Sequence, residues 1–165
     1  MKILVLSDSH AGLSFMRLCI RAVKPDAMIH LGDYFEDGTA MAEEFPLIPL
    51  HQVPGNCDRN RMVRFHPECL CYDVCGVRLY MTHGHNEHVK SGLYALRKNA
   101  NAACAQAALY GHTHEAYCQQ EEDGLWVLNP GSCGSTGGSC GVIETDGGKI
   151  LSCKILTWND LEATI

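Results

Sequence analysis

The chain has 165 residues, of which 46% are hydrophobic, 13 are basic and 19 are acidic, so its formal net charge is −6. This length suits one domain with a sizeable core, and we expect a single domain over residues 1–165. The acidic balance argues against a stable complex with nucleic acid or with an anionic membrane, because such binding depends on Lys and Arg contacts.

Cysteine usage indicates a reducing compartment. The chain has 10 cysteines, but the apolar run before Ser7 is too short for a signal peptide, and no run reaches the length of a membrane span. We therefore expect reduced thiols and a cytoplasmic protein. The cysteine groups at 69–75 and 133–140 lack the paired spacing of a zinc site, and we interpret them as small apolar residues.

The first half of the chain alternates apolar runs with amphipathic segments. Residues 2–7 and 28–33 are typical of buried strands, and 47–53 predicts a third strand interrupted by Pro49. Helices are expected over 13–24, which has apolar residues at helical spacing and ends at Pro25, and over 39–45.

The second half contains more hairpins. Residues 70–75 and 77–82 predict two strands joined at Gly76, followed by a helix over 91–101 and a strand-like stretch over 102–110. Further strands are expected at 116–121, 125–128, 141–144 and 149–157, with turns such as Asp123-Gly124 between them. The pattern predicts an α/β fold with two packed sheets and helices outside.

Five apolar runs end in side chains that bind metals. The ends of parallel strands meet at one edge of a sheet, so we expect these side chains to converge. The seven candidates are Asp8, His10, Asp33, Asn56, His83, His112 and His114. Nitrogen and oxygen ligands without thiolate suit Mn²⁺, Fe or Zn²⁺. Seven ligands exceed one ion's needs but fit two ions about 3.5–4 Å apart, which share Asp33, hold a bridging hydroxide and clamp a phosphate.

Each motif taken alone has a simpler interpretation. Asp8 and His10 can form local hydrogen bonds in a loop, Gly32-Asp33 and the segment 55–58 are good turn sequences, and a His-x-His pair can lie on the surface. We favour the metal centre because all the motifs occur together, each behind an apolar run. The remaining histidines outside these loops are interpreted as structural or surface residues: His30, His51, His66 and His88.

A cluster of arginines follows the third candidate loop. Arg59, Arg61 and Arg64 lie close together in an otherwise acidic chain. A solvated basic face is the simpler interpretation, and a phosphate contact beside the metals is the functional one. The sequence leaves both open.

The chain resembles the calcineurin-like metallophosphoesterase superfamily in five blocks: Asp8-x-His10, Gly32-Asp33, Gly55-Asn56-Cys57-Asp58, His83-Gly84-His85 and Gly111-His112-Thr113-His114. The short length, the Gly-Asn-Cys-Asp block and the later segment 129–132 (Asn-Pro-Gly-Ser) resemble its small YfcE-like phosphodiesterase branch. The resemblance spans residues 1 to about 157. It implies a four-layer α/β/β/α sandwich of two mixed sheets, with the metal site on loops at one end.

The resemblance also implies roles for the candidates. Asp8, His10 and His114 would hold one divalent ion, Asn56, His83 and His112 the second, and Asp33 both. The implied enzyme is a phosphodiesterase for small or activated phosphodiesters, which acts by in-line attack of the bridging hydroxide. Mn²⁺ is the first choice of metal, with Fe, Zn²⁺ or Ni²⁺ as alternatives. Asp58 is expected to orient a neighbouring ligand or the residue before it.

Cys57 departs from the family pattern, because many members have a histidine there that is thought to act as an acid. A thiol is a poorer phosphate partner than imidazolium. Proton donation therefore falls to Cys57, to His85, to water or to no group. We expect a preference for good leaving groups, such as those of aryl phosphodiesters.

Two other functions remain open at this point. One is a phosphomonoesterase or nucleotidase at the same site, and the other is a non-catalytic module that uses the metal site for docking, as retromer-type relatives do. A small phosphoester is the expected partner. Close relatives are often oligomers, so a homo-oligomer is also expected, and the apolar tail at 155–165 would either form that contact or cover the protein's own sheet.

Overall fold

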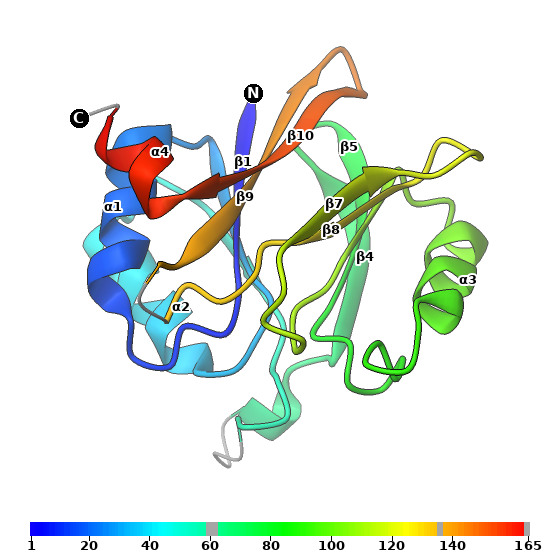
Figure 1. The fold of residues 1–165 in the computed structure, drawn as a ribbon, viewed down its shortest axis with the longest axis horizontal. Coiled ribbons are helices and arrows are strands. Elements are labelled where there is room, and N and C mark those ends of the chain that lie inside the picture. Colours follow the sequence, from blue (N-terminus) through cyan, green and yellow to red (C-terminus); the bar gives the residue numbers. More distant parts are fainter. Residues whose placement is uncertain (59–62, 135–136, 164–165) are drawn as a thin grey trace.

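A computed structural model describes residues 1–58, 63–134 and 137–163 of the chain (Figure 1). In this part of the chain two five-stranded sheets face each other, and helices cover their outer faces. The predicted four-layer α/β/β/α sandwich of two mixed sheets is confirmed.

The first sheet combines parallel strands with a C-terminal hairpin. Its strand order is β10 (Lys149–Thr157), β9 (Ser139–Asp146), β1 (Lys2–Leu6), β2 (Ala27–His30) and β3 (Leu50–Gln52). Strands β1, β2 and β3 run parallel, and β9 pairs with β1 in the antiparallel direction. The three parallel strands therefore end at the same edge, where polar loops follow.

The second sheet repeats this plan. Its order is β4 (Cys69–Val74), β5 (Val77–Thr82), β6 (Ala107–Leu109), β8 (Trp126–Asn129) and β7 (Tyr117–Gln120). Strands β5, β6 and β8 are parallel, whereas β4 and β7 are antiparallel to their neighbours. The predicted hairpin about Gly76 is confirmed as β4–β5.

Helices flank both sheets. The chain forms α1 (Leu13–Val23), α2 (Phe35–Glu44), α3 (Tyr94–Ala102), α4 (Trp158–Glu162) and a short 3₁₀ helix (Val63–Phe65). Helices α1, α2 and α4 pack on the first sheet, and α3 packs on the second. None of the helices in the described residues has the length and apolarity needed to cross a membrane.

Alternate residues of the central strand β1 face different layers. Ile3 and Val5 pack between the sheets, whereas Leu4 and Leu6 pack against the helices outside. All four side chains are buried, which explains why this strand is a continuous apolar run rather than an alternating one.

Several element boundaries differ from the prediction: the strand expected at 47–53 covers only Leu50–Gln52, and the helix expected at 91–101 begins at Tyr94. Two other differences change which residues pack or pair. Helix α2 begins at Phe35 rather than at residue 39, because Phe35 and Met41 both bury their side chains and so extend its packed face. The stretch 102–110 is not one strand: α3 continues to Ala102, and only Ala107–Leu109 pairs in the sheet.

The described part of the C-terminal tail covers the protein's own helix. Residues Trp158–Glu162 form α4, which begins with a capping box between Thr157 and Asp160. The ring of Trp158 stacks on Phe15 of α1 at a centroid distance of 5.5 Å, and Leu161 is buried. Of the two roles considered for the tail, these contacts favour intramolecular packing.

A buried polar network supports the loop after β1. The Ser9 hydroxyl and the Ala11 N–H both donate to Asp37 Oδ2, at 2.7 Å and 2.9 Å. His30 Nε2 lies 3.2 Å from Ser9 Oγ. Because the hydroxyl proton of Ser9 is directed to Asp37, His30 must donate through Nε2–H. Burial lowers the pKa of His30 from 6.5 to about 4, so this ring is neutral at pH 7.

Replacing Leu79 tests the core between the sheets, because this side chain is fully buried there. Leu151 provides a control, because it is 64% exposed. We expect Leu79→Ala to lower the free energy of unfolding by about 2–5 kcal/mol, since it removes buried methyl groups and leaves a cavity. The control Leu151→Ala should change it by about 0.5 kcal/mol or less. Urea unfolding followed by circular dichroism measures both, and equal losses would contradict this core.

His30 makes the fold sensitive to acid. Its pKa is about 4 in the folded chain and 6.5 when exposed, so the unfolded chain binds more protons between these values. Its contribution of roughly 3 kcal/mol is therefore present above pH 6.5 and lost as the pH falls through 4. In His30→Gln the loss of unfolding free energy between pH 7 and 4.5 should be smaller by about 2–3 kcal/mol. Urea unfolding with chelator present tests this, and identical pH profiles would contradict it.

Candidate metal centre

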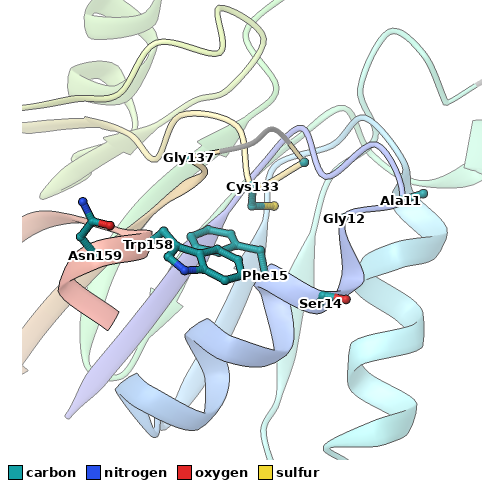
Figure 2. A pocket seen from close by; sticks show the side chains of 9 residues that line it. Ala11, Gly12, Ser14, Phe15, Cys133, Gly137, Trp158 and Asn159 are labelled. Atoms are coloured by element: carbon teal, nitrogen blue, oxygen red, sulfur yellow. The ribbon is translucent and has the colours of Figure 1, made fainter. Parts of the chain in front are cut away.

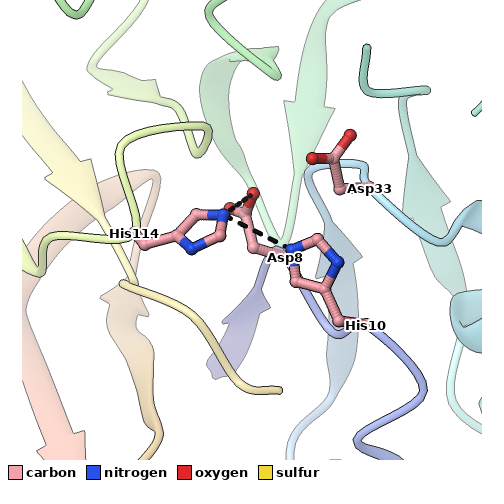
Figure 3. Close-up of side chains that lie close together, drawn as sticks. All are labelled: Asp8, His10, Asp33 and His114. Carbon is pink, nitrogen blue, oxygen red and sulfur yellow. Dashed lines mark hydrogen bonds and ion pairs between the residues drawn. The ribbon is translucent and has the colours of Figure 1, made fainter. Parts of the chain in front are cut away.

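The predicted ligands converge at one end of the sandwich. They lie in the loops after β1, β2, β3, β5 and β6, which all open at that end. Four of them, Asp8, His10, Asp33 and His114, each place one ligand atom so that all four atoms lie within 4.8 Å of one another (Figure 3).

The first cluster contains one buried oxygen without a hydrogen-bond partner in the described part of the chain. Asp8 is fully buried, and its Oδ2 accepts hydrogen bonds from Ser7 Oγ at 2.6 Å and from the His112 N–H at 3.1 Å. Its Oδ1 lies 3.0 Å from His114 Nε2 but makes no hydrogen bond with the described residues. His10 Nε2 lies 3.4 Å from His114 Nε2. A buried carboxylate oxygen without a donor, facing two imidazole nitrogens, fits a cation.

The second cluster adjoins Asp33. His83 Nε2 lies 3.1 Å from Asn56 Oδ1 and 3.5 Å from Asp33 Oδ1, and the His83 and His112 rings are 5.0 Å apart. His83 Nδ1 lies 2.8 Å from the Leu31 carbonyl oxygen, so in the neutral ring the proton belongs on Nδ1. The lone pair of Nε2 then faces the oxygens of Asn56 and Asp33, an arrangement that also fits a cation.

Strained backbone coincides with the candidate ligands. Five of the seven have positive φ angles, a conformation that residues other than glycine rarely adopt. These angles are 52° at Asp8, 43° at His10, 54° at Asp33, 68° at His112 and 62° at His114. Such conformations cost about 1–3 kcal/mol each and gather where function requires a fixed side-chain direction.

Protonation states in the centre suit metal ligands. Burial raises the pKa of Asp33, but the Cys57 N–H, which donates to Oδ1 at 2.8 Å, and the nearby His83 outweigh it and hold that pKa below 3.8. Burial, and next the proximity of His83, lower the pKa of His112. The carboxylate is therefore ionised and the imidazole neutral at pH 7, as coordination requires.

Asp58 connects two of the loops. Its Oδ2 accepts the Gly55 N–H at 2.7 Å, and its Oδ1 accepts the Phe35 N–H at 2.8 Å. The loop after β3 is thereby tied to the start of α2, next to Asp33. Cys57 lies in the same loop, where its sulfur accepts a hydrogen bond from Asn56 Nδ2 at 3.4 Å.

His85 lies beside the second cluster. Its ring centroid is 5.5 Å from that of His83 and 6.2 Å from that of His112. Its Nδ1 is buried and has no hydrogen-bond partner among the described residues. Burial, followed by His83, lowers its pKa, so the ring is neutral at pH 7.

Two supporting residues were not assigned a role from the sequence. Asn129 Nδ2 donates to the Gly111 carbonyl at 3.0 Å and to Thr113 Oγ1 at 2.9 Å, on either side of His112. Ser132 Oγ donates to the Asp8 carbonyl at 2.8 Å. The position of Asn129 at the end of the buried strand β8 is the signal that would have indicated it.

The arginine cluster cannot be placed in the same way. Arg59 and Arg61 and the side chain of Arg64 lie outside the described residues. The suggested phosphate contact therefore stays a prediction.

A separate pocket adjoins the end of the loop after β1. It has a volume of about 520 Å³ and is bordered by the start of α1, the start of α4 and the segment around Cys133 (Figure 2). The stacked rings of Phe15 and Trp158 form an apolar wall. None of the candidate ligands lines this pocket, so it is distinct from the metal centre.

Comparison with known proteins points to one family over most of the chain. Residues 1–148 match the model of the calcineurin-like phosphoesterase superfamily domain. The phosphodiesterase MJ0936 of Methanocaldococcus jannaschii is 29% identical over 154 residues, which cover 81% of this chain and 84% of that protein.

Solved structures agree with this match. A predicted phosphoesterase of Streptococcus pneumoniae superposes with a TM-score of 0.76 and 26% identity, over 94% of this chain and 88% of that one. Vps29 of Entamoeba histolytica in complex with Zn²⁺ has a TM-score of 0.70 and 18% identity, over 95% of this chain and 99% of that one, and shares the fold. The resemblance of the five sequence blocks is thus confirmed, and the chain belongs to the calcineurin-like phosphoesterase superfamily.

Proposed function

We propose that the protein is a phosphodiesterase that uses two divalent metal ions to hydrolyse small or activated phosphodiesters. The observation that supports this most directly is the buried Asp8 Oδ1, which has no hydrogen-bond partner among the described residues and faces the imidazole of His114. The relative named as a phosphodiesterase supports the choice of substrate.

The two clusters suggest how the metals are divided. Asp8, His10 and His114 would hold one ion, Asn56, His83 and His112 would hold the other, and Asp33 would contribute to both. When bound, two divalent ions activate water as a nucleophile and neutralise charge on the phosphoryl oxygens. Mn²⁺ is the first choice for this mixed nitrogen and oxygen set, followed by Fe, Zn²⁺ and Ni²⁺.

The chain itself fixes the directions of these ligands. The Leu31 carbonyl sets the tautomer of His83, and the His112 N–H holds one oxygen of Asp8 so that the other faces the site. Asp58 acts as a positioning residue through its two backbone hydrogen bonds. Such supporting contacts reduce the reorganisation that substrate binding requires.

Proton transfer to the leaving group falls to Cys57 or His85, or to water. Cys57 follows the candidate ligand Asn56, and His85 lies beside His83 and His112. Neither group is a strong acid, so we infer a preference for esters with good leaving groups. We place this activity in the cytoplasm, because the cysteines of the described residues form no disulfide bonds with one another.

A binding module without catalysis is the second candidate. The retromer-type relatives named in the sequence analysis are the reason to consider it, whereas the candidate ligand cluster favours the enzyme. The two proposals differ in whether the metal-loaded protein hydrolyses a phosphoester.

Metal dependence tests the phosphodiesterase. Chelated protein should be inactive on bis-p-nitrophenyl phosphate, and Mn²⁺ should restore activity. Asp33→Asn should lower kcat/KM at least about 100-fold, beyond the 10–100-fold typical of residues that only support a ligand. Asp73→Asn, at an exposed residue of β4, is the matched control and should retain activity.

Elemental analysis completes this experiment, because the parent should bind two ions and Asp33→Asn fewer. Faster hydrolysis of p-nitrophenyl phosphate than of the diester would identify a phosphomonoesterase. If the protein binds two ions but hydrolyses neither substrate, the result would support the non-catalytic binding module. Full activity of Asp33→Asn would contradict the assigned site.

Replacing Cys57 tests whether this position lacks a general acid that protonates the leaving group. Cys57→His should raise kcat/KM about 10-fold or more on diphenyl phosphate, whose leaving group needs protonation, and change it little on bis-p-nitrophenyl phosphate. Cys104→His, at an exposed thiol in the loop after α3, is the control. If His85 is the acid, His85→Gln should selectively slow the diphenyl ester. An unchanged rate of Cys57→His on the poorer leaving group would contradict the acid hypothesis for this position.

A further inference from the structure

An exposed aromatic ring borders the first ligand cluster. Tyr34 follows Asp33 directly and is 43% exposed. Its ring centroid lies 5.2 Å from that of His10, with an angle of 69° between the planes. The tyrosine therefore meets a candidate metal ligand edge to face and leaves part of its own ring open to solvent.

The backbone fixes the direction in which this side chain leaves the chain. Tyr34 has φ 69° and ψ 59°, and the preceding Asp33 also has a positive φ. Two consecutive residues in this conformation are strained by about 1–3 kcal/mol each. The Asp37 N–H donates to the Tyr34 carbonyl at 2.9 Å, and the Phe35 N–H donates to Asp58. The strain is thus maintained by contacts on the C-terminal side of Tyr34.

Packing does not account for this ring. Tyr34 belongs to none of the three hydrophobic clusters of the described residues. Its hydroxyl has no hydrogen-bond partner among them either. Tyr94 on α3 is also exposed, at 79%, but has no ring contact with a candidate ligand within the described part. An exposed, oriented ring at the rim of a site fits a role in ligand contact.

We propose that Tyr34 is a stacking platform for a planar aromatic group of the substrate, an aryl or a nucleobase. This inference rests on the proposed phosphoesterase function, because it places the phosphate at the metals and the ring of the same ester on Tyr34. Stacking needs a flat π surface and no hydrogen-bond pattern, so the platform accepts different rings. Phosphoesters without a ring gain no binding energy from stacking on Tyr34.

Binding to Mn²⁺-loaded protein by isothermal titration calorimetry tests the platform without hydrolysis. The ligands are phenyl phosphate, adenosine 5′-monophosphate and the ring-free methyl phosphate. Tyr34→Ala should weaken binding of at least one ring-containing ligand about 10-fold, and methyl phosphate less than about 2-fold, because stacking contributes only to the former. Tyr34→Phe should bind like the parent, and Tyr94→Ala is the control at an exposed tyrosine.

The outcomes are separable. A loss confined to phenyl phosphate identifies an aryl substituent, and a loss confined to the nucleotide identifies a nucleoside. Equal losses for all three ligands, or no loss, would overturn the platform, with metal content and circular dichroism checking that Tyr34→Ala folds and loads. Hydrolysis without any ring preference would overturn this inference alone. Failure of Mn²⁺-loaded parent protein to bind any phosphate would overturn it together with the proposed function.

Discussion

One hydrogen bond joins the two sheets at the candidate centre, and the arrangement of the site depends on it. Asp8, at the end of β1, accepts the backbone N–H of His112, which follows β6 of the other sheet. A second link runs the other way, from the His83 ring beyond β5 to the Leu31 carbonyl beyond β2. Both require the sheets to face each other in one register, and the apolar layer between them supplies that constraint. The core between the sheets therefore determines the geometry of the loops that carry the candidate ligands.

The loops that carry the candidate ligands are energetically unfavourable for the chain alone. Five candidate ligands have strained backbones, and within the part of the chain that the structure describes a buried oxygen of Asp8 makes no hydrogen bond. Folding energy from the surrounding layers maintains these features, and a bound cation would relieve the unpaired charge. Metal binding would in this way be coupled to stability, since a ligand that binds only the folded state stabilises it.

The ring of Tyr34 and the thiol of Cys57 border the candidate ligands. Both residues directly follow a candidate ligand, and both are exposed. The sequence indicated that Cys57 replaces a histidine, because the family block made its position visible. Tyr34 gave no signal, since an aromatic residue after a strand is as typical of a core as of a surface.

The sequence by itself determined the strands 77–82 and 149–157 and the two-sheet plan, because these depend on short-range patterns that repeat every two or four residues. It also determined the identity and order of the candidate ligands, because each of them follows an apolar run. Only the tertiary structure decided the early start of α2, the positive φ angles of the ligands, the tautomer of His83 and the support from Asn129. These depend on contacts between distant segments, such as Asp8 and His112, which lie 104 residues apart. Local propensity contains no information about such pairs, since packing of the two sheets brings them together.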